Sequence, residues 1–169
     1  MPREGMSRKE YFERKFGGGK TVEEMNCRMT AVGIQEGISF ALDRIERTPN
    51  TFDAHRLGWY ATRKGRGEEV AEGLFRAFFT QGRDIGDRAV LADVGAAAGL
   101  DRADVERFLA SDEGVREVRE EERQARQNGI DAVPTFIIGG KIAVTGAQSP
   151  DVFLEAFHSL TQEARHQTG

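Results

Sequence analysis

The sequence predicts a mostly helical chain that ends in a short β-hairpin and a final helix. Apolar residues recur at helical spacing from residue 21 to residue 128, and capping residues and glycines divide that stretch. Two short apolar runs flank Gly139 and Gly140, a pair suited to the positive φ angles of a tight hairpin. Hydrophobic residues make up 38% and charged residues 31% of the chain, which indicates helices with wide solvated faces around a modest core.

The N-terminal part is predicted to hold a lead-in and one amphipathic helix. Residues 1–20 are expected to form the lead-in, and its polar first ten residues are expected to be either a loose segment or a fraying first helix. Thr21 and Glu24 fit a capping box, which predicts a helix from Thr21 toward Gly37. Cys27 is expected to be a small buried side chain of this helix. The apolar positions that are expected to face the core follow at spacings of three and four: Val22, Met25, Met29 and Val32.

Five more helices are predicted up to residue 129, each delimited by capping residues or glycines. The helix over 68–79 carries a wide aromatic stripe, which is expected to join the core of the helical region. The charged helix over 113–128 is expected to be solvated and to form pairs at i,i+3 and i,i+4. The other three helices are expected after the Asn50 and Asp53 caps, from Asp87 to Gly99, and after the Asp101 and Asp104 caps. The aromatic side chains expected in the core are Trp59, Phe75, Phe78 and Phe79.

The strongest local signals lie between residues 131 and 153. Pro134 has no N–H, so it is expected at the mouth of the strand that follows it, over 135–138. Gly139 and Gly140 then turn the chain into a second strand. Ser149 as N-cap and Pro150 at the first helical position open the last helix, which is expected to run from Asp151 to about Ala164.

Five segments of the chain match one known family in order: Asn50–Leu57, Leu74–Ile85, Phe108–Asp112, Ala132–Phe136 and Val144–Phe153. They resemble the DsbA family, in the group of FrnE-like and 2-hydroxychromene-2-carboxylate isomerase-like proteins. The resemblance implies the α/β class, mostly α in this chain: a thioredoxin-like fold with an inserted helical domain, from which the N-terminal βαβ unit is absent. It divides the chain into a lead-in at 1–20, the inserted helical domain at 21–128 and a C-terminal ββα part at 129–169.

The function that the resemblance implies is thiol–disulfide exchange. Family members carry a cysteine pair at a helix N-terminus, which stabilises the thiolate. This sequence has the single Cys27, which does not match a catalytic position, so the chain itself is expected to be redox-inactive. The pair is expected upstream of Met1 in a full-length protein. A start codon placed too far downstream or a deliberate fragment is favoured over a natural remnant with a changed role.

The resemblance also implies where a substrate binds. The Val133–Pro134 bond is expected to be cis and to oppose the cysteine pair, and the Val133 backbone is expected to pair with an extended peptide. No catalytic residue is implied within the chain. The implied substrate-binding residues are Val133, Pro134 and Thr135, with Gly146, Ala147 and Gln148 nearby.

Two other functions stay open. Isomerase and kappa-class glutathione transferase relatives have a serine in place of the first cysteine and bind glutathione against the same Val-Pro loop. The position that would hold this serine or cysteine is expected upstream of Met1. The sequence therefore does not separate glutathione-dependent chemistry from thiol–disulfide exchange. A non-enzymatic peptide-binding or chaperone-like module would instead use the aromatic stripe and an open strand edge.

The expected partners are protein thiols or disulfides, or glutathione, and a homodimer remains open. Interleaved charges with a net charge of −4 speak against nucleic acid, and the apolar runs are too short for a bilayer. The N-terminus lacks the pattern of a signal peptide, which favours the cytoplasm. No nucleotide cofactor is expected, because the glycine-rich segment at 14–21 has Arg14 where a phosphate-binding loop needs its first glycine. No other cofactor and no metal is expected either, because the histidines, His55, His158 and His166, lack the spacing of metal ligands.

Overall fold

The computed structural model describes residues 2–17 and 19–167, apart from the side chains of 19–21 and 163–167. The chain divides into two units, Met1–Val118 and Arg119–Gly169, each of which is described by itself. This division falls within a helix, α7 (Val115–Gln127), whereas the sequence predicts a domain boundary at 128/129. The fold is mostly helical α/β, as predicted, and the seven predicted helices correspond to α2–α8.

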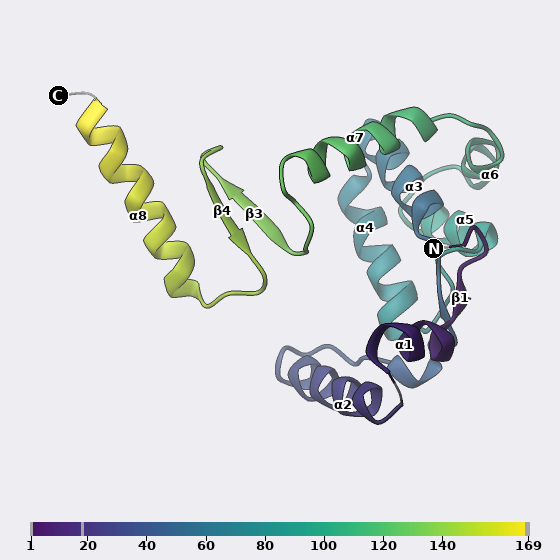
Figure 1. Cartoon of the computed structure of the whole chain (residues 1–169). Helices are drawn as coiled ribbons and strands as arrows, with labels where there is room; N and C mark the ends of the chain where they lie inside the picture. Colours follow the sequence, from purple (N-terminus) through teal and green to yellow (C-terminus); the bar gives the residue numbers. More distant parts are fainter. Residues whose placement is uncertain (1, 18, 168–169) are drawn as a thin grey trace. The chain divides into compact units, whose positions relative to one another are not determined.

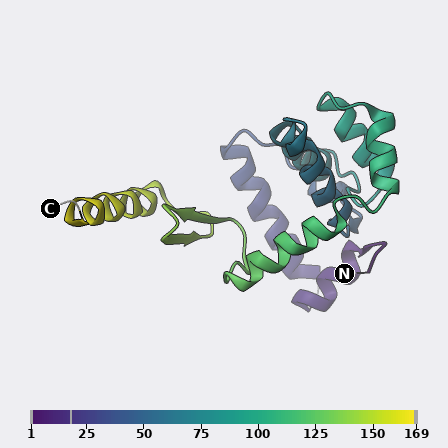
Figure 2. The same ribbon diagram turned by 90° about the horizontal axis from the view of Figure 1, so that it is seen from above.

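The core of the first unit is a group of four helices that gather in both views (Figures 1 and 2). They are α3 (Phe52–Arg63), α4 (Gly67–Phe75), α5 (Arg88–Ala97) and α6 (Arg102–Ala110). Each contributes apolar side chains from one face, and each fully buried Val or Leu stabilises the fold by about 1.5–3 kcal/mol. The fully buried aliphatic side chains are Leu57, Val70, Leu91, Val105 and Leu109.

Two of the predicted helix caps are confirmed. The Asp87 carboxylate accepts a hydrogen bond from the Ala89 N–H at 2.8 Å and begins α5. The Asp101 carboxylate accepts from the Asp104 N–H at 2.9 Å and begins α6. At the start of α3, the Asn50 carboxamide oxygen accepts from the Phe52 N–H at 3.0 Å.

The segment that the sequence analysis takes as the lead-in, residues 1–20, holds a short strand and a helix. A two-residue strand, β1 (Met6–Ser7), pairs antiparallel with β2 (Arg47–Thr48), and α1 (Arg8–Phe16) follows it. Gly5 permits this pairing, because it has a φ of +72° and lies so close to the Thr48 carbonyl that a Cβ would be only 2.7 Å from the oxygen. Polar composition concealed the pairing, because its stabilising contacts come from a partner strand far along the sequence.

Helix α2 (Gly19–Gln35) presents a different face to its neighbours than the sequence predicts. Its inward side carries Asn26, which accepts a hydrogen bond from Arg8 at 3.2 Å, and Gly33, against which the Phe40 ring packs. The apolar positions Met25, Met29 and Val32 are therefore exposed, and Cys27 is exposed rather than buried. The helix begins at Gly19, two residues before the predicted cap at Thr21. The Thr21 side chain, and with it the predicted capping box, lies outside the described residues.

The aromatic stripe is also displaced from the core. Helix α4 ends at Phe75 and continues as a π-helical turn, η2 (Arg76–Thr80), in which the Gln81 N–H donates to the Arg76 carbonyl. The turn directs Ala77 into the core and leaves the Phe75 side chain 62% exposed. The phenylalanines pack instead on one another, with Phe79 against Phe75, Phe78 and Phe40. A 3₁₀ turn, η1 (Leu42–Arg44), lies just before β2.

The second unit contains the hairpin and the last helix. Strands β3 (Thr135–Ile138) and β4 (Ile142–Thr145) pair antiparallel, and α8 (Pro150–Gln167) begins at the predicted proline. Gly139 and Gly140 both have positive φ, +59° and +69°, as the predicted tight turn requires. One face of the hairpin packs on α8, where the Phe136 and Phe153 rings meet edge to face at 5.0 Å.

Candidate functional site

The loop that enters β3 is held in place by its own backbone. The Val133–Pro134 peptide bond is cis. The Gly146 N–H donates to the Pro134 carbonyl at 2.8 Å, and the Thr135 hydroxyl donates to the Ala132 carbonyl at 2.7 Å. The Val133 side chain is 89% exposed, so this ordered loop presents an apolar residue to solvent.

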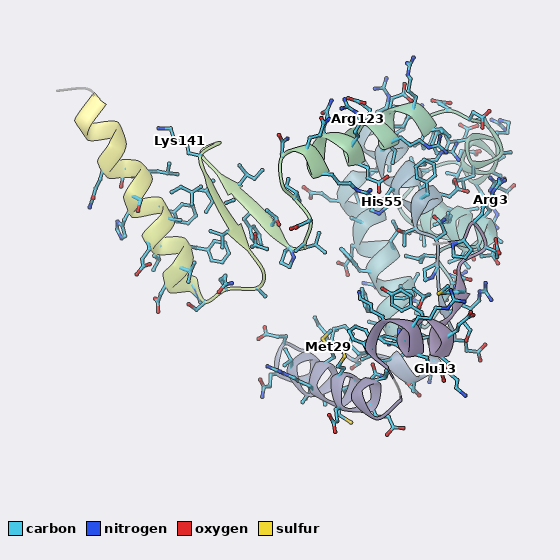
Figure 3. All side chains as sticks on the ribbon, in the orientation of Figure 1. Arg3, Glu13, Met29, His55, Arg123 and Lys141 are labelled. Carbon is cyan, nitrogen blue, oxygen red and sulfur yellow. The ribbon has the colours of Figure 1, made fainter. Side chains whose placement is uncertain are left out.

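The other three predicted site residues follow β4 and lie beside this loop. Gly146 has a φ of +85°, which a residue with a side chain rarely adopts, and its bond to Pro134 joins the two segments. The Gln148 carboxamide donates to the Thr145 carbonyl at 2.9 Å and closes the turn toward α8. All six predicted residues therefore gather at one end of the hairpin, and Lys141 marks the other end (Figure 3).

The hydrogen-bonding pattern of the hairpin leaves one edge of β3 open. Directly opposed residues of an antiparallel pair alternate between hydrogen-bonded and non-bonded positions. Because Pro134 and Gly146 form a bonded position, Phe136 and Ile138 also direct their backbone groups toward β4. Thr135 and Ile137 consequently direct theirs away from β4, and in the described part of the chain β3 pairs with no other strand.

The six predicted site residues include no strongly acidic, basic or thiol side chain. None of them carries a thiol, an imidazole, a carboxylate or an amine. The nearest charges along the chain are Asp131, two residues before Val133, and Asp151, three residues after Gln148. Backbone N–H and C=O groups beside an apolar side chain suit an extended polypeptide, which such an edge recognises through main-chain hydrogen bonds.

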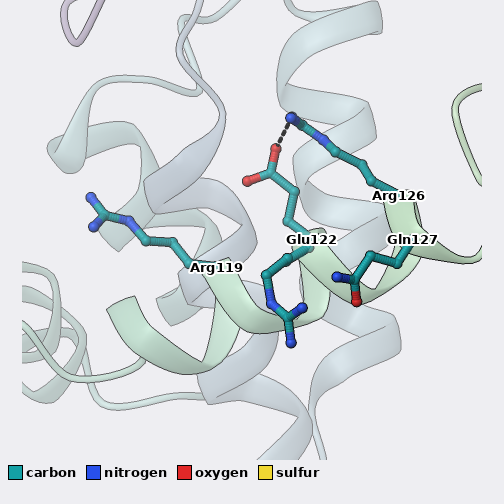
Figure 4. A pocket seen from close by; sticks show the side chains of 5 residues that line it. Arg119, Glu122, Arg126 and Gln127 are labelled. Carbon is teal, nitrogen blue, oxygen red and sulfur yellow. Dashed lines mark hydrogen bonds and ion pairs between the residues drawn. The ribbon is translucent and has the colours of Figure 1, made fainter.

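A hollow of about 330 Å³ on α7 is lined by charged side chains of that one helix (Figure 4). Arg126 donates to Glu122, and Arg123 donates to Glu120. The hydrogen bond from Arg123 is the main reason why the pKa of Glu120 is lowered to about 2. These pairs agree with the predicted solvated face. The lining residues are Arg119, Glu122, Arg123, Arg126 and Gln127.

A second hollow, in the first unit, has no counterpart among the sequence predictions. Tyr60, Arg63, Lys64 and Glu113 line about 680 Å³ of open space at the C-terminal half of α3. The Lys64 ammonium lies 5.5 Å from the Tyr60 ring centre, and the Arg63 guanidinium lies 4.9 Å from that of Trp59. The signal in the sequence was only a lysine and an arginine four residues after two aromatics, a spacing that is common on solvated helices.

Two residues weighed as candidates lie away from any cluster. His55 is exposed on α3, and Cys27 is exposed on α2. Within residues 2–17 and 19–167, no three His, Cys, Asp or Glu side chains come together as metal ligands would. In the same described residues no helix combines the length and apolarity needed to cross a bilayer.

Comparison with known proteins assigns the chain to a family. The profile of the DSBA-like thioredoxin domain matches residues 3–158, so the chain belongs to that family. Its structure is similar to that of the probable DsbA oxidoreductase SCO1869 from Streptomyces coelicolor, with a TM-score of 0.84 and 29% identity, over 94% of this chain and 68% of that one. The uncharacterized protein YwbO of Bacillus subtilis (strain 168) is 31% identical over 125 residues. That match covers 71% of this chain and 60% of YwbO, so the chain spans about three fifths of this relative's length.

Proposed function

We propose that the chain supplies the substrate-binding surface of a DsbA-like thiol–disulfide oxidoreductase. Family membership supports the reaction class, because a DsbA oxidoreductase is among the similar structures. The ordered, exposed loop of Val133, Pro134 and Thr135 supports the binding role. In this proposal the loop holds an extended segment of a protein substrate through its backbone, beside Gly146, Ala147 and Gln148.

The observation that carries the proposal is the exposed Val133 of this loop, whose backbone is expected to pair with an extended peptide, with the Thr135 N–H next along the same edge. An extended peptide gains main-chain hydrogen bonds there, and side chains that alternate along it contact the apolar loop. The exchange reaction additionally needs a thiolate and a second sulfur. Since the site has no sulfur, its contribution is to bind the substrate and orient it.

Peptide binding to two proline variants tests the role of the edge. The probe is a labelled, extended, apolar peptide with serine in place of cysteine, followed by fluorescence anisotropy. Thr135→Pro removes an N–H that points to the open edge and leaves the ladder bonds of β3 intact, so we expect at least about tenfold weaker binding, equivalent to 1.4 kcal/mol. It also removes the hydroxyl that donates to the Ala132 carbonyl, so Thr135→Val, which lacks only the hydroxyl, is measured beside it and is expected to bind more tightly than Thr135→Pro.

Thr145→Pro is the matched control. Thr145 lies opposite Thr135 in the register, and its N–H points to the outer edge of β4 by the same alternation. We expect the control to bind the peptide as the parent chain does, and circular dichroism to show that both variants keep their helices. Equal loss in both variants, or no loss in either, would refute binding at this edge.

The second candidate is a non-enzymatic peptide-binding module, favoured by the absence of a reacting group among the six site residues. It predicts the same peptide binding without redox turnover in any longer form of the protein. Glutathione, the ligand of the isomerase and transferase type, can be tested as a competitor of the labelled peptide. If glutathione displaces the labelled peptide equally well from the parent and from Thr145→Pro, the result would favour the isomerase and transferase type.

A further inference from the structure

The hollow at the C-terminal half of α3 gathers charged side chains that form no ion pair. Arg63 and Lys64 are exposed there, and they line about 680 Å³ of open space together with Glu113. In the part of the chain that the structure describes, most arginines form an ion pair with a carboxylate, but Arg63 and Lys64 form none. The two cations are therefore available to a ligand.

Two carboxylates near these cations leave them unpaired. Glu113 lines the same hollow without pairing with either cation, and its position is fixed because its carbonyl accepts two hydrogen bonds from Arg56, at 2.8 and 3.1 Å. Glu117 interacts with Arg63 only at longer range and pairs instead with Arg116 at 3.1 Å. Two positive charges and one negative charge thus line the hollow, which leaves an excess of positive charge.

Aromatic rings hold both cations in place. The Arg63 guanidinium lies 4.9 Å from the Trp59 ring centre, and the Lys64 ammonium lies 5.5 Å from that of Tyr60. Both rings stack in turn on the buried Phe108, with centre-to-centre distances of 6.4 and 4.4 Å. Because the core anchors the rings and the rings position the cations, a ligand has less side-chain freedom to restrict when it binds.

We propose that this hollow binds a small molecule with two or more ionised oxyanion groups, either carboxylates or phosphates. The guanidinium of Arg63 and the ammonium of Lys64 supply charge-assisted hydrogen bonds to such groups. Tyr60, which also lines the hollow, has a hydroxyl that can donate as well. The open space lies within the range of small-molecule sites, about 300–1,000 Å³. The excess of positive charge disfavours a cationic ligand and favours one with more than one negative charge.

Glu113 limits the affinity for such an anion. Its carboxylate has the same sign as the ligand, so it repels the ligand across the hollow. Loss of the charge of Glu113 should therefore strengthen binding, whereas loss of the charge of Arg63 should weaken it. The proposal does not depend on the proposed function, because none of the residues that line this hollow belongs to the peptide site.

An NMR titration of the isotope-labelled 169-residue chain tests the site, with citrate, pyrophosphate and acetate as separate probes at constant ionic strength. Trp59 is the only tryptophan, so its indole N–H gives a single signal beside Arg63. We expect saturable shifts of this signal and of the Lys64 amide. At least one of citrate and pyrophosphate should bind about fivefold or more tightly than acetate, and the tighter of the two shows whether carboxylate or phosphate suits the site better.

Three variants that each remove one charge locate the binding. Arg63→Gln is expected to weaken binding of the tighter probe about fivefold, the effect of an exposed ion pair, and Glu113→Gln is expected to strengthen it. Arg66→Gln is the matched control, because Arg66 does not line the hollow and pairs with Glu69 at 3.0 Å. We expect this control to bind as the parent does. Circular dichroism checks that all three variants keep their helices.

Three results would overturn the proposal. The first is the absence of a saturable shift at Trp59 with citrate and with pyrophosphate up to about 10 mM, because still weaker binding is not specific recognition. The second is equal weakening in Arg63→Gln and Arg66→Gln, which would show a response to overall charge. The third is weaker binding by Glu113→Gln, which would mean that the ligand does not place its negative charge in this hollow.

Discussion

Arg56 shows how one side chain organises the first unit. It is 2% exposed in α3 and donates to three backbone carbonyls, that of Phe108 in the last turn of α6 and those of Ser111 and Glu113 just after it. Its Nε also donates to the Glu113 carbonyl, and its Nη1 donates to the Asp53 carboxylate at 2.7 Å in an ion pair. A buried guanidinium is tolerated when its nitrogens donate hydrogen bonds. If Arg56 is removed, the carbonyls that accepted these bonds are buried without a donor, which is costly.

Replacement of Arg56 by alanine is expected to destabilise the first unit by about 1–3 kcal/mol or more, because the buried Phe108 carbonyl and the part-buried Ser111 and Glu113 carbonyls lose this donor. Urea unfolding followed by Trp59 fluorescence measures this, since Trp59 stacks near Phe108. Arg88→Ala is the control: Arg88 pairs with the same Asp53 but is largely exposed, so about 1 kcal/mol or less is expected. Similar losses in both variants would contradict this role of burial.

Glu120 makes a pH prediction at the residue scale. Its pKa is lowered from 4.5 to about 2, first by the hydrogen bond from Arg123 and then by that from Gln124. A carboxyl whose folded pKa is depressed stabilises the fold above its unfolded pKa and loses that contribution as the pH falls. For Glu120 this stabilising contribution is lost as the pH falls from 4.5 to about 2.

An NMR titration of the Glu120 carboxyl carbon is expected to give a midpoint near 2 in the parent chain and one closer to 4.5 in Arg123→Gln. Because both side chains are about half exposed to solvent, added salt should bring the two midpoints closer together. A parent midpoint already at 4.5 would show that the ion pair does not form in solution.

At the scale of elements, the helix ends were the most readable part of the sequence. Asp87 and Asp101 were identified as caps from their position before an apolar run, and both accept the predicted backbone hydrogen bonds. The hairpin followed from Gly139 and Gly140 in the same way. Such signals are local, because a cap or a tight turn depends on the residue itself and its near neighbours.

Asp101→Ala is expected to destabilise the packing of α6 by about 0.5–2 kcal/mol, because the Asp104 N–H loses its acceptor. Trp59 fluorescence in a urea titration reports this change, since α6 carries Phe108. Asp101→Ser restores an acceptor and should recover most of the loss. Failure of serine to recover stability would mean that the cap hydrogen bond is not the cause.

Contacts between segments that are far apart in the sequence could not be predicted from it. Helix α2 was expected to bury Met25 and Met29, but Arg8 and Phe40 bind its other face, and neither residue is near it in sequence. The π turn at Arg76–Thr80 likewise moved Phe75 out of the expected core. At the candidate site, the gathering of Val133 and Gln148 was expected from family resemblance, and their role in binding remains a prediction.

For the whole molecule, the proposed binding surface and the chemistry of disulfide exchange are separate. The chain belongs to the DSBA-like thioredoxin domain family, and its one cysteine lies exposed on α2. Disulfide exchange in such proteins proceeds through a mixed disulfide that a second cysteine resolves. A single thiol does not provide that resolving step.

We therefore expect the 169-residue chain not to accelerate the reduction of insulin by dithiothreitol, and Cys27→Ser to behave like the parent. The turbidity of precipitating insulin chains follows the reaction. Turnover by the parent that survives Cys27→Ser would contradict the assignment of this chain to substrate binding alone.

The most direct test of the central claim is amide hydrogen exchange with and without the apolar peptide, at a chain concentration too low for self-association. Binding at the open edge of β3 predicts slower exchange at Thr135 and Ile137, and unchanged exchange at Thr145, whose N–H points to the other edge. Protection confined to the helices of the first unit, or equal at Thr135 and Thr145, would contradict the claim.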